Sequence, residues 1–167
     1  MENNQNTLSG VNSKGVKWTY VGEILMGEAH GKGKCFWSDG REYEGEYVKE
    51  VTYGKGKFTS RPGNVYEGYF EHDIVRGKVT FKKTGEVYEG DFKKNYIPHG
   101  QGTHTWASGK TYEGEFADGV MHGIGKMTYE NGDIFEGEFV NGLIHGKGKL
   151  TIEGKWENGK QLSELKE

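Results

Sequence analysis

The chain has 167 residues, enough for one domain, and its formal net charge of −3 gives no overall basic field for binding nucleic acid. Its single cysteine, Cys35, excludes an internal disulfide framework and suits a reducing compartment. No apolar run approaches the roughly 18 residues of a membrane-spanning helix, and the N-terminal stretch lacks the pattern of a secretion signal. We therefore expect a soluble intracellular, cytoplasmic protein.

Glycine and aromatic residues dominate the composition. The chain holds 29 glycines, more than double the usual share of about 7%. Low hydrophobicity alone would favour disorder, but 13% of the residues are aromatic, which favours a packed core. We therefore expect the glycines to be structural.

Residues 1–13 precede the repeated pattern and are predicted to form a flexible tail, and residues 14–160 are predicted to form a repeat array. Units 1 to 6 begin, 22–24 residues apart, at Tyr20, Tyr43, Tyr66, Tyr88, Tyr112 and Phe135, and a half-repeat begins at Ile152. A fixed period of this length predicts stacked units that pack on their neighbours. Residues 161–167 are predicted to be a tail or a short helical cap.

Unit 5 illustrates the structure predicted for every unit. In its first strand, 112–116, alternation places Tyr112, Gly114 and Phe116 on one face. An Ala-Asp-Gly turn leads to a second strand over 122–129, and an Asn-Gly turn leads to the next unit. Because every link is a short turn and no segment has helical periodicity, the predicted fold class is all-β. It is a twisted, single-layer antiparallel meander, or solenoid, of about six hairpins.

The strand glycines are predicted to be seats for aromatic rings. Two or three of them cost about 1.5–3 kcal/mol per unit, whereas burying two aromatic side chains contributes about 3–6 kcal/mol. A ring can lie flat over bare glycine backbone, so packing outweighs the cost. The predicted structural glycines are Gly45, Gly68, Gly90, Gly114, Gly123, Gly125, Gly137, Gly146 and Gly148.

These units resemble MORN (membrane occupation and recognition nexus) repeats, whose pattern runs Tyr-Glu-Gly-x-aromatic, then Gly, then His-Gly-x-Gly. The likeness covers residues 20–160, with departures. Unit 2 has Glu50 at the turn glycine and Tyr53 at the histidine position. Unit 3 lacks one residue and carries Arg76 near that position, and unit 4 has an extra residue near 96–100. We therefore expect a local irregularity across residues 72–100.

Three features that look like reactive sites are better explained by the repeat. The Gly-x-Gly-Lys stretches lack the earlier glycine of a phosphate-binding loop; Val120, for example, stands five residues before Gly125. The Glu-x-Glu pairs recur almost unchanged opposite Lys pairs, which favours a solvated face rather than a catalytic pair. Equivalent histidines would lie about 10 Å apart, too far to share one zinc ion; they are His30, His99, His122 and His145. We predict no enzyme activity, no metal and no cofactor.

The aromatic face of the sheet is predicted to form a groove about 60 Å long, because six hairpins each advance about 10 Å. Exposed aromatic strips of this kind mark partner surfaces, and a helix or extended peptide is the natural occupant. The predicted groove residues are Tyr47, Phe58, Tyr66, Phe70, Tyr88, Phe92, Trp106, Tyr112, Phe116, Tyr129 and Phe139.

The resemblance implies a non-catalytic scaffold that tethers a protein partner to a membrane or to the cytoskeleton. One alternative is direct binding of acidic phospholipids such as phosphoinositides or phosphatidate, although no cluster of four to eight basic residues supports it. A second alternative is a regulatory subunit of a separate enzyme. A strand edge left by the half-repeat could also pair two copies into a homodimer.

Overall fold

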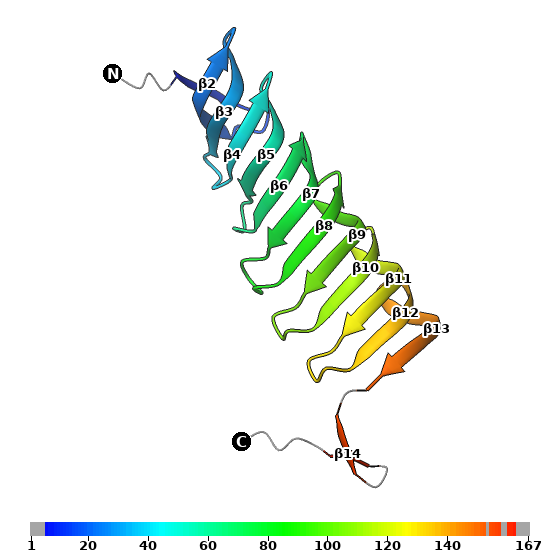
Figure 1. Cartoon of the computed structure of the whole chain (residues 1–167). Helices are drawn as coiled ribbons and strands as arrows, with labels where there is room; N and C mark the ends of the chain where they lie inside the picture. The colour runs from blue at the N-terminus through cyan, green and yellow to red at the C-terminus, as the bar shows by residue number, and fades with distance from the viewer. Residues whose placement is uncertain (1–5, 153, 158–159, 163–167) are drawn as a thin grey trace.

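The computed structural model describes residues 6–152, 154–157 and 160–162. In that part of the chain, thirteen strands form one antiparallel sheet in sequence order, which confirms the predicted meander. Figure 1 shows the strands lying side by side from one end of the array to the other. The strands of the sheet are β1 (Asn6–Val11), β2 (Lys17–Leu25), β3 (Glu28–Trp37), β4 (Glu42–Val48), β5 (Val51–Thr59), β6 (Val65–Glu71), β7 (Asp73–Thr80), β8 (Val87–Lys93), β9 (Ile97–Thr105), β10 (Thr111–Ala117), β11 (Val120–Thr128), β12 (Ile134–Val140) and β13 (Leu143–Thr151).

The two ends of the array differ from the predicted boundaries. Residues 6–11 do not form a tail, because β1 pairs with β2 and places Gly10 opposite Trp18. A Cβ on Gly10 would lie 2.7 Å from the Trp18 ring, so the indole rests on bare backbone. At the other end, β14 (Lys155–Glu157) and β15 (Lys160–Leu162) pair only with each other in the described structure. The half-repeat therefore does not extend the sheet, and β13 is its last strand. The predicted cap falls partly on β15, and residues 163–167 lie outside the described residues.

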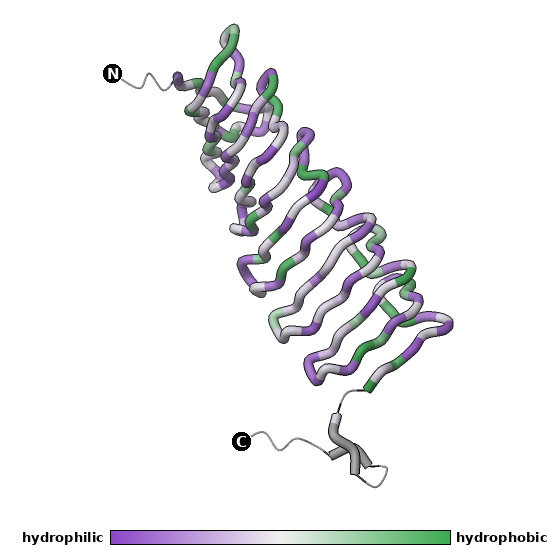
Figure 2. The backbone as a smooth tube through the Cα atoms, viewed as in Figure 1, coloured by the Kyte–Doolittle hydropathy of each residue, from purple (hydrophilic) through white to green (hydrophobic). Residues whose placement is uncertain are grey.

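Tight turns with left-handed backbone join the two strands of most units. In unit 5, Asp118 and Gly119 have φ values of 54° and 86°, the geometry of the two-residue turn that matches the twist of a hairpin. In unit 2 the same two positions are Lys49 and Glu50, at 50° and 67°, with no glycine to relieve the strain. Strongly hydrophilic residues recur along the strands between these turns, separated by residues nearer the middle of the scale or hydrophobic ones (Figure 2).

A row of glycines crosses the sheet, one on each strand from β2 to β13, and every member lies directly opposite the next. The glycine row is Gly22, Gly33, Gly45, Gly56, Gly68, Gly77, Gly90, Gly102, Gly114, Gly125, Gly137 and Gly148. In unit 5, a Cβ on Gly125 would lie 2.4 Å from ring atoms of Tyr112. In every unit except unit 3, the first aromatic residue therefore lies directly on this row, where a side chain would displace it.

A bulge bends the second strand of most units. In unit 5, Gly123 and Ile124 stand between the residues paired with Glu115 and Gly114, and Gly123 has a φ of 60°. The Glu115 carboxylate accepts a hydrogen bond from the Ile124 N–H at 3.3 Å. Acidic side chains lie against the matching glycines of units 1, 2, 4 and 6, which are Gly31, Gly54, Gly100 and Gly146. In units 1, 4 and 5 this acid also accepts a hydrogen bond from the bulge backbone, whereas the sequence predicts only a solvated face for the acids.

The core is a ladder of aromatic rings on one face of the sheet. Tyr112 packs edge-to-face on Phe116 of its own unit at 5.2 Å and on Phe139 of the next unit at 4.9 Å. Tyr43 repeats this pattern with Tyr47 and Phe70, at 5.2 and 5.1 Å. Since each of these tyrosines also contacts a ring of the next unit, the core continues from one unit to its neighbour.

The predicted irregularity across residues 72–100 occurs at the junction of units 3 and 4. In unit 3 only His72 separates the paired residues Glu71 and Asp73, whereas the turn of unit 4 spans three residues between Lys93 and Ile97. The added residue brings Tyr96 over the core. Its ring stacks on Phe58 at 5.0 Å and contacts Tyr66 at 4.9 Å.

Candidate interaction surfaces

Most residues of the predicted groove are buried by one another. Nine are at most 9% exposed: Tyr47, Phe58, Tyr66, Phe70, Tyr88, Phe92, Tyr112, Phe116 and Phe139. Trp106 and Tyr129 are only partly buried against this core. The nine buried rings build the support of the face, and other side chains supply its accessible surface.

The first tyrosine of several units is also tied down by its hydroxyl group. Tyr112 Oη donates to the carbonyl oxygens of Glu115 and His122, which lie 3.0 and 3.1 Å away at the bulge. Tyr20 Oη has the equivalent partners, Glu23 and His30, at 2.7 and 3.1 Å. Burial raises the pKa of Tyr112 to about 12, so its hydroxyl stays protonated and keeps donating.

A second row of residues, the loop-end row, lies where β-strands meet the turns between units. Its members are Trp37, Ser60, Phe81, Trp106 and Tyr129. Each closes its turn through the backbone; Trp106, for example, donates to Lys110 O and accepts from Gly109 N, both at 2.9 Å. The four aromatic members are partly buried against the core, so they keep accessible ring surface. Trp37 and Phe81 are absent from the predicted groove, although their place just before the turn glycines matches that of Trp106 and Tyr129.

Two rings of the loop-end row lie beneath cationic side chains. Lys110 Nζ lies 4.1 Å from the Trp106 ring centre, and the Arg41 guanidinium lies 5.2 Å from that of Trp37. Cations at these distances are attracted by the ring faces. The row is therefore an aromatic surface with basic groups at its margin.

A histidine joins this surface in unit 4. His104 stacks on Trp106 at 4.4 Å, and its Nε2 lies 3.3 Å from Glu86 Oε2. Burial lowers the pKa of His104, although Glu86 acts in the opposite direction. The imidazole therefore occupies a position that apolar side chains or cysteine hold in the other five units, and burial favours its neutral form.

The opposite face of the sheet carries alternating charges. A ladder of cross-strand neighbours runs Lys34, Glu44, Lys57, Glu67, Lys78, Glu89, Thr103, Glu113, Lys126, Glu136 and Lys149. Ion pairs at 3.4 Å between Lys34 and Glu44, and at 3.1 Å between Lys57 and Glu67, join neighbours on it. Exposed pairs of this kind contribute about 0–1 kcal/mol each. Because positive and negative side chains alternate, their charges largely offset one another on this face.

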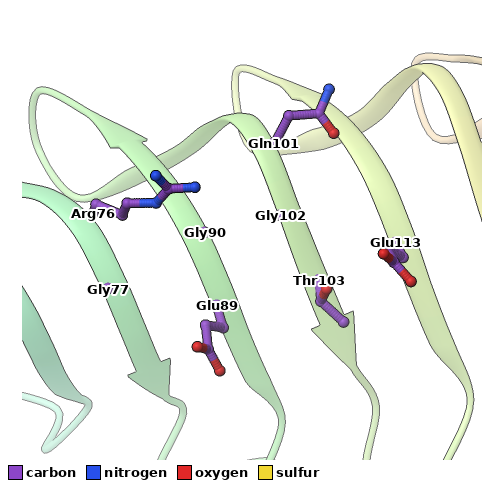
Figure 3. Close-up of a pocket in the computed structure, with 8 residues that line it drawn as sticks. All are labelled: Arg76, Gly77, Glu89, Gly90, Gln101, Gly102, Thr103 and Glu113. Carbon is purple, nitrogen blue, oxygen red and sulfur yellow. The ribbon is translucent and has the colours of Figure 1, made fainter.

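Thr103 interrupts that alternation. It stands between Glu89 and Glu113, and together with Arg76 and Gln101 these residues line a shallow hollow of about 460 Å³ over the glycine row (Figure 3). Backbone of Gly77, Gly90 and Gly102 forms part of its lining, and the Cβ positions of Gly90 and Gly102 point to the other face, against Tyr88.

In the part of the chain that the structure describes, no group of three or more histidine, cysteine or acidic side chains is arranged to hold a metal ion. No helix among those residues is long and apolar enough to cross a bilayer. The histidines of the repeat instead lie at the bulges, where the carbonyl groups of His30 and His122 accept hydrogen bonds from tyrosine.

Comparison with known families bears on the whole array. No curated protein matches the chain in a sequence comparison. The family model described as "MORN repeat" matches residues 20–40, 43–65, 88–111, 112–134 and 135–152, more than half of the chain. The matched segments coincide with five of the six units. MORN repeats are non-catalytic modules that generally mediate interactions with proteins or membranes. The chain belongs to the MORN repeat family.

Proposed function

We propose that the protein is a non-catalytic intracellular scaffold. It binds a helix or extended peptide of a partner protein along its aromatic face and tethers that partner to a membrane or the cytoskeleton. The loop-end row is the observation that carries the proposal, because it repeats partly accessible rings along one face of the array. Aromatic side chains of this kind are enriched in protein interfaces.

The length of the row suits a peptide partner. From Trp37 in unit 1 to Tyr129 in unit 5, the row crosses eight strand spacings, or about 40 Å at roughly 4.8 Å each. A helix of about 25 residues has this length, at about 1.5 Å per residue. The contact is proposed to rest on the loop-end row, since the nine buried rings beneath it offer almost no accessible surface.

The test compares two triple variants of the full chain. The first replaces Trp37, Phe81 and Trp106 of the loop-end row with serine. The control also introduces three serines, in place of Phe36, Tyr53 and Tyr69. These aromatic residues are 38–43% exposed and lie outside the loop-end row. Each protein is checked for folding by circular dichroism and used for affinity capture from native lysate, with quantitative mass spectrometry.

We expect at least one protein to be enriched by the wild type and by the control but lost with the first variant. Equal enrichment by all three chains would reject the loop-end row as the binding surface. If the captured protein is lost only with the control variant, the binding surface is the charged face instead. If the protein captured is an enzyme, its activity with and without the scaffold tests the regulatory-subunit alternative.

The alternating charges weigh against acidic phospholipid as the primary ligand. The lysines of the charged face lie beside carboxylates, as in the pair of Lys57 and Glu67 at 3.1 Å, so they form no concentrated basic patch. Flotation with vesicles containing phosphatidylserine or a phosphoinositide, at physiological salt, tests this alternative. We expect no co-flotation, and binding that depends on Lys34 and Lys57 would reverse the assignment.

We also propose that β13 can pair two copies of the chain. All residues of β13 are exposed, and Leu143 and Leu150 expose 72% and 57% of their surfaces. An exposed apolar edge strand favours pairing with another strand. Light scattering after size-exclusion chromatography should give a dimer that the exposed-edge changes Leu143→Lys and Leu150→Lys convert to monomer. A monomeric wild-type chain at high concentration would reject this proposal.

A further inference from the structure

A cavity of about 320 Å³ lies over unit 1, on the aromatic face. It exists because unit 1 places the smallest side chains at two repeated positions. The residues opposite the fifth position of each unit are Ala29, Thr52, Ile74, Pro98, Met121 and Ile144. Those opposite the first position are Cys35, Phe58, Val79, His104, Met127 and Leu150. Ala29 and Cys35 thus leave space that larger residues fill in later units.

The walls of this cavity are mainly apolar and aromatic. Trp18 and Trp37 face each other across the paired strands β2 and β3, and Leu8 of β1 adds an aliphatic side chain. Burial raises the pKa of the Cys35 thiol to about 11, which keeps this part of the wall uncharged at neutral pH. Glu50 is the one carboxylate among the lining residues. Such a lining favours an uncharged ring and disfavours an anion.

One polar group in this wall has no partner. Tyr47 lines the cavity and is 5% exposed, and no described residue forms a hydrogen bond with its hydroxyl group. Phenylalanine holds the equivalent position in units 3 to 6, so packing does not require this hydroxyl. The hydroxyls of Tyr20 and Tyr112, by contrast, both donate to backbone carbonyls. A buried hydroxyl without a partner is unfavourable and marks a place where a ligand atom could bind.

We propose that this cavity binds an uncharged aromatic ring carrying a hydrogen-bonding oxygen or nitrogen, which pairs with the Tyr47 hydroxyl. The volume of about 320 Å³ is about twice the roughly 150 Å³ of an engineered apolar cavity that holds benzene. Because the hydroxyl is covered, the ring must shift a neighbouring side chain to reach it. The site does not depend on the proposed scaffold function, since a free ring can occupy it without a protein partner.

The test uses two probes that differ by one hydroxyl group, p-cresol and toluene. Binding to the full chain is followed by tryptophan fluorescence and by NMR shifts of the Ala29 and Leu8 methyl groups. We expect p-cresol to bind about five- to tenfold more tightly than toluene, the gain of one hydrogen bond. Tyr47→Phe, which copies the residue of other units, should remove that preference and leave toluene binding unchanged.

Cys35→Met is the cavity-filling variant, because methionine is the residue of unit 5 at the same position. It should weaken both probes at least tenfold. Leu150→Met introduces the same residue at the equivalent position of unit 6 and should leave both affinities unchanged. Thermal unfolding of each variant confirms that it is folded. Equal affinity of p-cresol for wild type and Tyr47→Phe would mean that the hydroxyl binds water only, and would overturn the proposal. Unchanged binding to a folded Cys35→Met chain would also overturn it.

A further comparison tests whether the ring belongs to a polypeptide or to a small molecule. A blocked Gly-Tyr-Gly peptide is compared with Gly-Leu-Gly under the same conditions. Tighter binding of the tyrosine peptide than of p-cresol assigns the ring to a polypeptide partner, whereas weaker binding assigns it to a small molecule. Equal binding of the leucine and tyrosine peptides, with no p-cresol binding, would exclude an aromatic site.

Discussion

Units 3 and 5 form the same hairpin from different local parts. Unit 5 has a bulge glycine, an acid that caps it and a two-residue turn, and the family model matches it. Unit 3 has Val75 and Tyr69 in place of the glycine and the acid, a one-residue turn, and no match to the model. Both nevertheless keep the paired row glycines and rings that are at most 9% exposed. The glycine row is therefore common to both units, while the bulge glycine, its acid and the two-residue turn are all replaced in unit 3.

The largest expected effect comes from adding a methyl group to the glycine row. Gly125→Ala should destabilise the chain by about 3 kcal/mol, because the new Cβ would lie 2.4 Å from the Tyr112 ring. Urea unfolding of this variant in a Tyr112→Ala background should show a much smaller cost. An equal cost in both backgrounds would contradict the seating of the ring.

The corresponding variant of unit 3 separates ring clash from backbone clash. A Cβ on Gly77 would lie 2.3 Å from Glu67 O and 2.7 Å from Gly68 Cα. Gly77→Ala should therefore cost about 3 kcal/mol whether or not Tyr66 is trimmed to alanine. If Tyr66→Ala reduced the cost of Gly77→Ala, the clash in unit 3 would be with the ring, as in unit 5.

A reciprocal exchange tests whether the acid and the bulge glycine act together. Glu115→Tyr should destabilise unit 5 by about 1 kcal/mol, since the Ile124 N–H loses its carboxylate partner. Tyr69→Glu should give no gain in unit 3, which has no bulge glycine to cap, and it removes the contact of Tyr69 with Tyr53 at 5.9 Å. Stabilisation by Tyr69→Glu, measured by thermal unfolding, would show that the acid acts independently.

Replacing the strained turn residue of unit 2 by glycine should raise the stability of the chain by a similar or smaller amount. Glu50 in unit 2 has a φ of 67°, whereas Gly119 holds the same place in unit 5. Glu50→Gly relieves left-handed strain worth roughly 1 kcal/mol, partly offset by glycine's greater freedom in the unfolded chain. The urea midpoint should therefore rise slightly. Glu50→Ala, which keeps the strain, is the control, and an equal rise with alanine would exclude backbone strain as the cause.

The smallest effect should appear as a dependence on pH. Because the pKa of His104 is lowered in the folded chain, the unfolded chain binds a proton more readily, so stability should fall as pH drops below about 6.5. Glu86 and Lys110 are the charged groups that act on this ring, in opposite directions. His104→Met copies the buried Met127 of unit 5 and should flatten this part of the pH profile. An unchanged profile would mean that another group controls it.

Much of the fold can be predicted from the spacing of Tyr-x-Gly and Gly-x-Gly along the chain. Alternation places Tyr112, Gly114 and Phe116 on one face, and the short turns permit only a meander. The bulge is harder to predict, because Gly123 and Gly125 look alike in sequence although one is left-handed and the other extended. Strand β1 is also hard to predict, because residues 6–11 carry no repeat motif although Gly10 pairs with Trp18.

The candidate surface is predicted less well, because burial depends on neighbouring units. Phe116 and Trp106 are equally plausible groove residues in sequence. Phe116 is sealed between Tyr88 and Tyr112, whereas Trp106 stands at a turn with one side open to Lys110. Side-chain size at matched positions also decides where space remains, as the small Ala29 and Cys35 do in unit 1.

The ring of Tyr96 has a consequence for how the array could change in length. The other ring contacts among the described residues join a unit only to itself or to an adjacent unit. Such units could be removed or duplicated while each ring still found a glycine beneath it, in steps of about 10 Å. Tyr96 of unit 4 instead reaches both Phe58 of unit 2 and Tyr66 of unit 3. Removing unit 2, 3 or 4 would therefore break a contact that spans all three, and a change in array length is expected to cost least outside them.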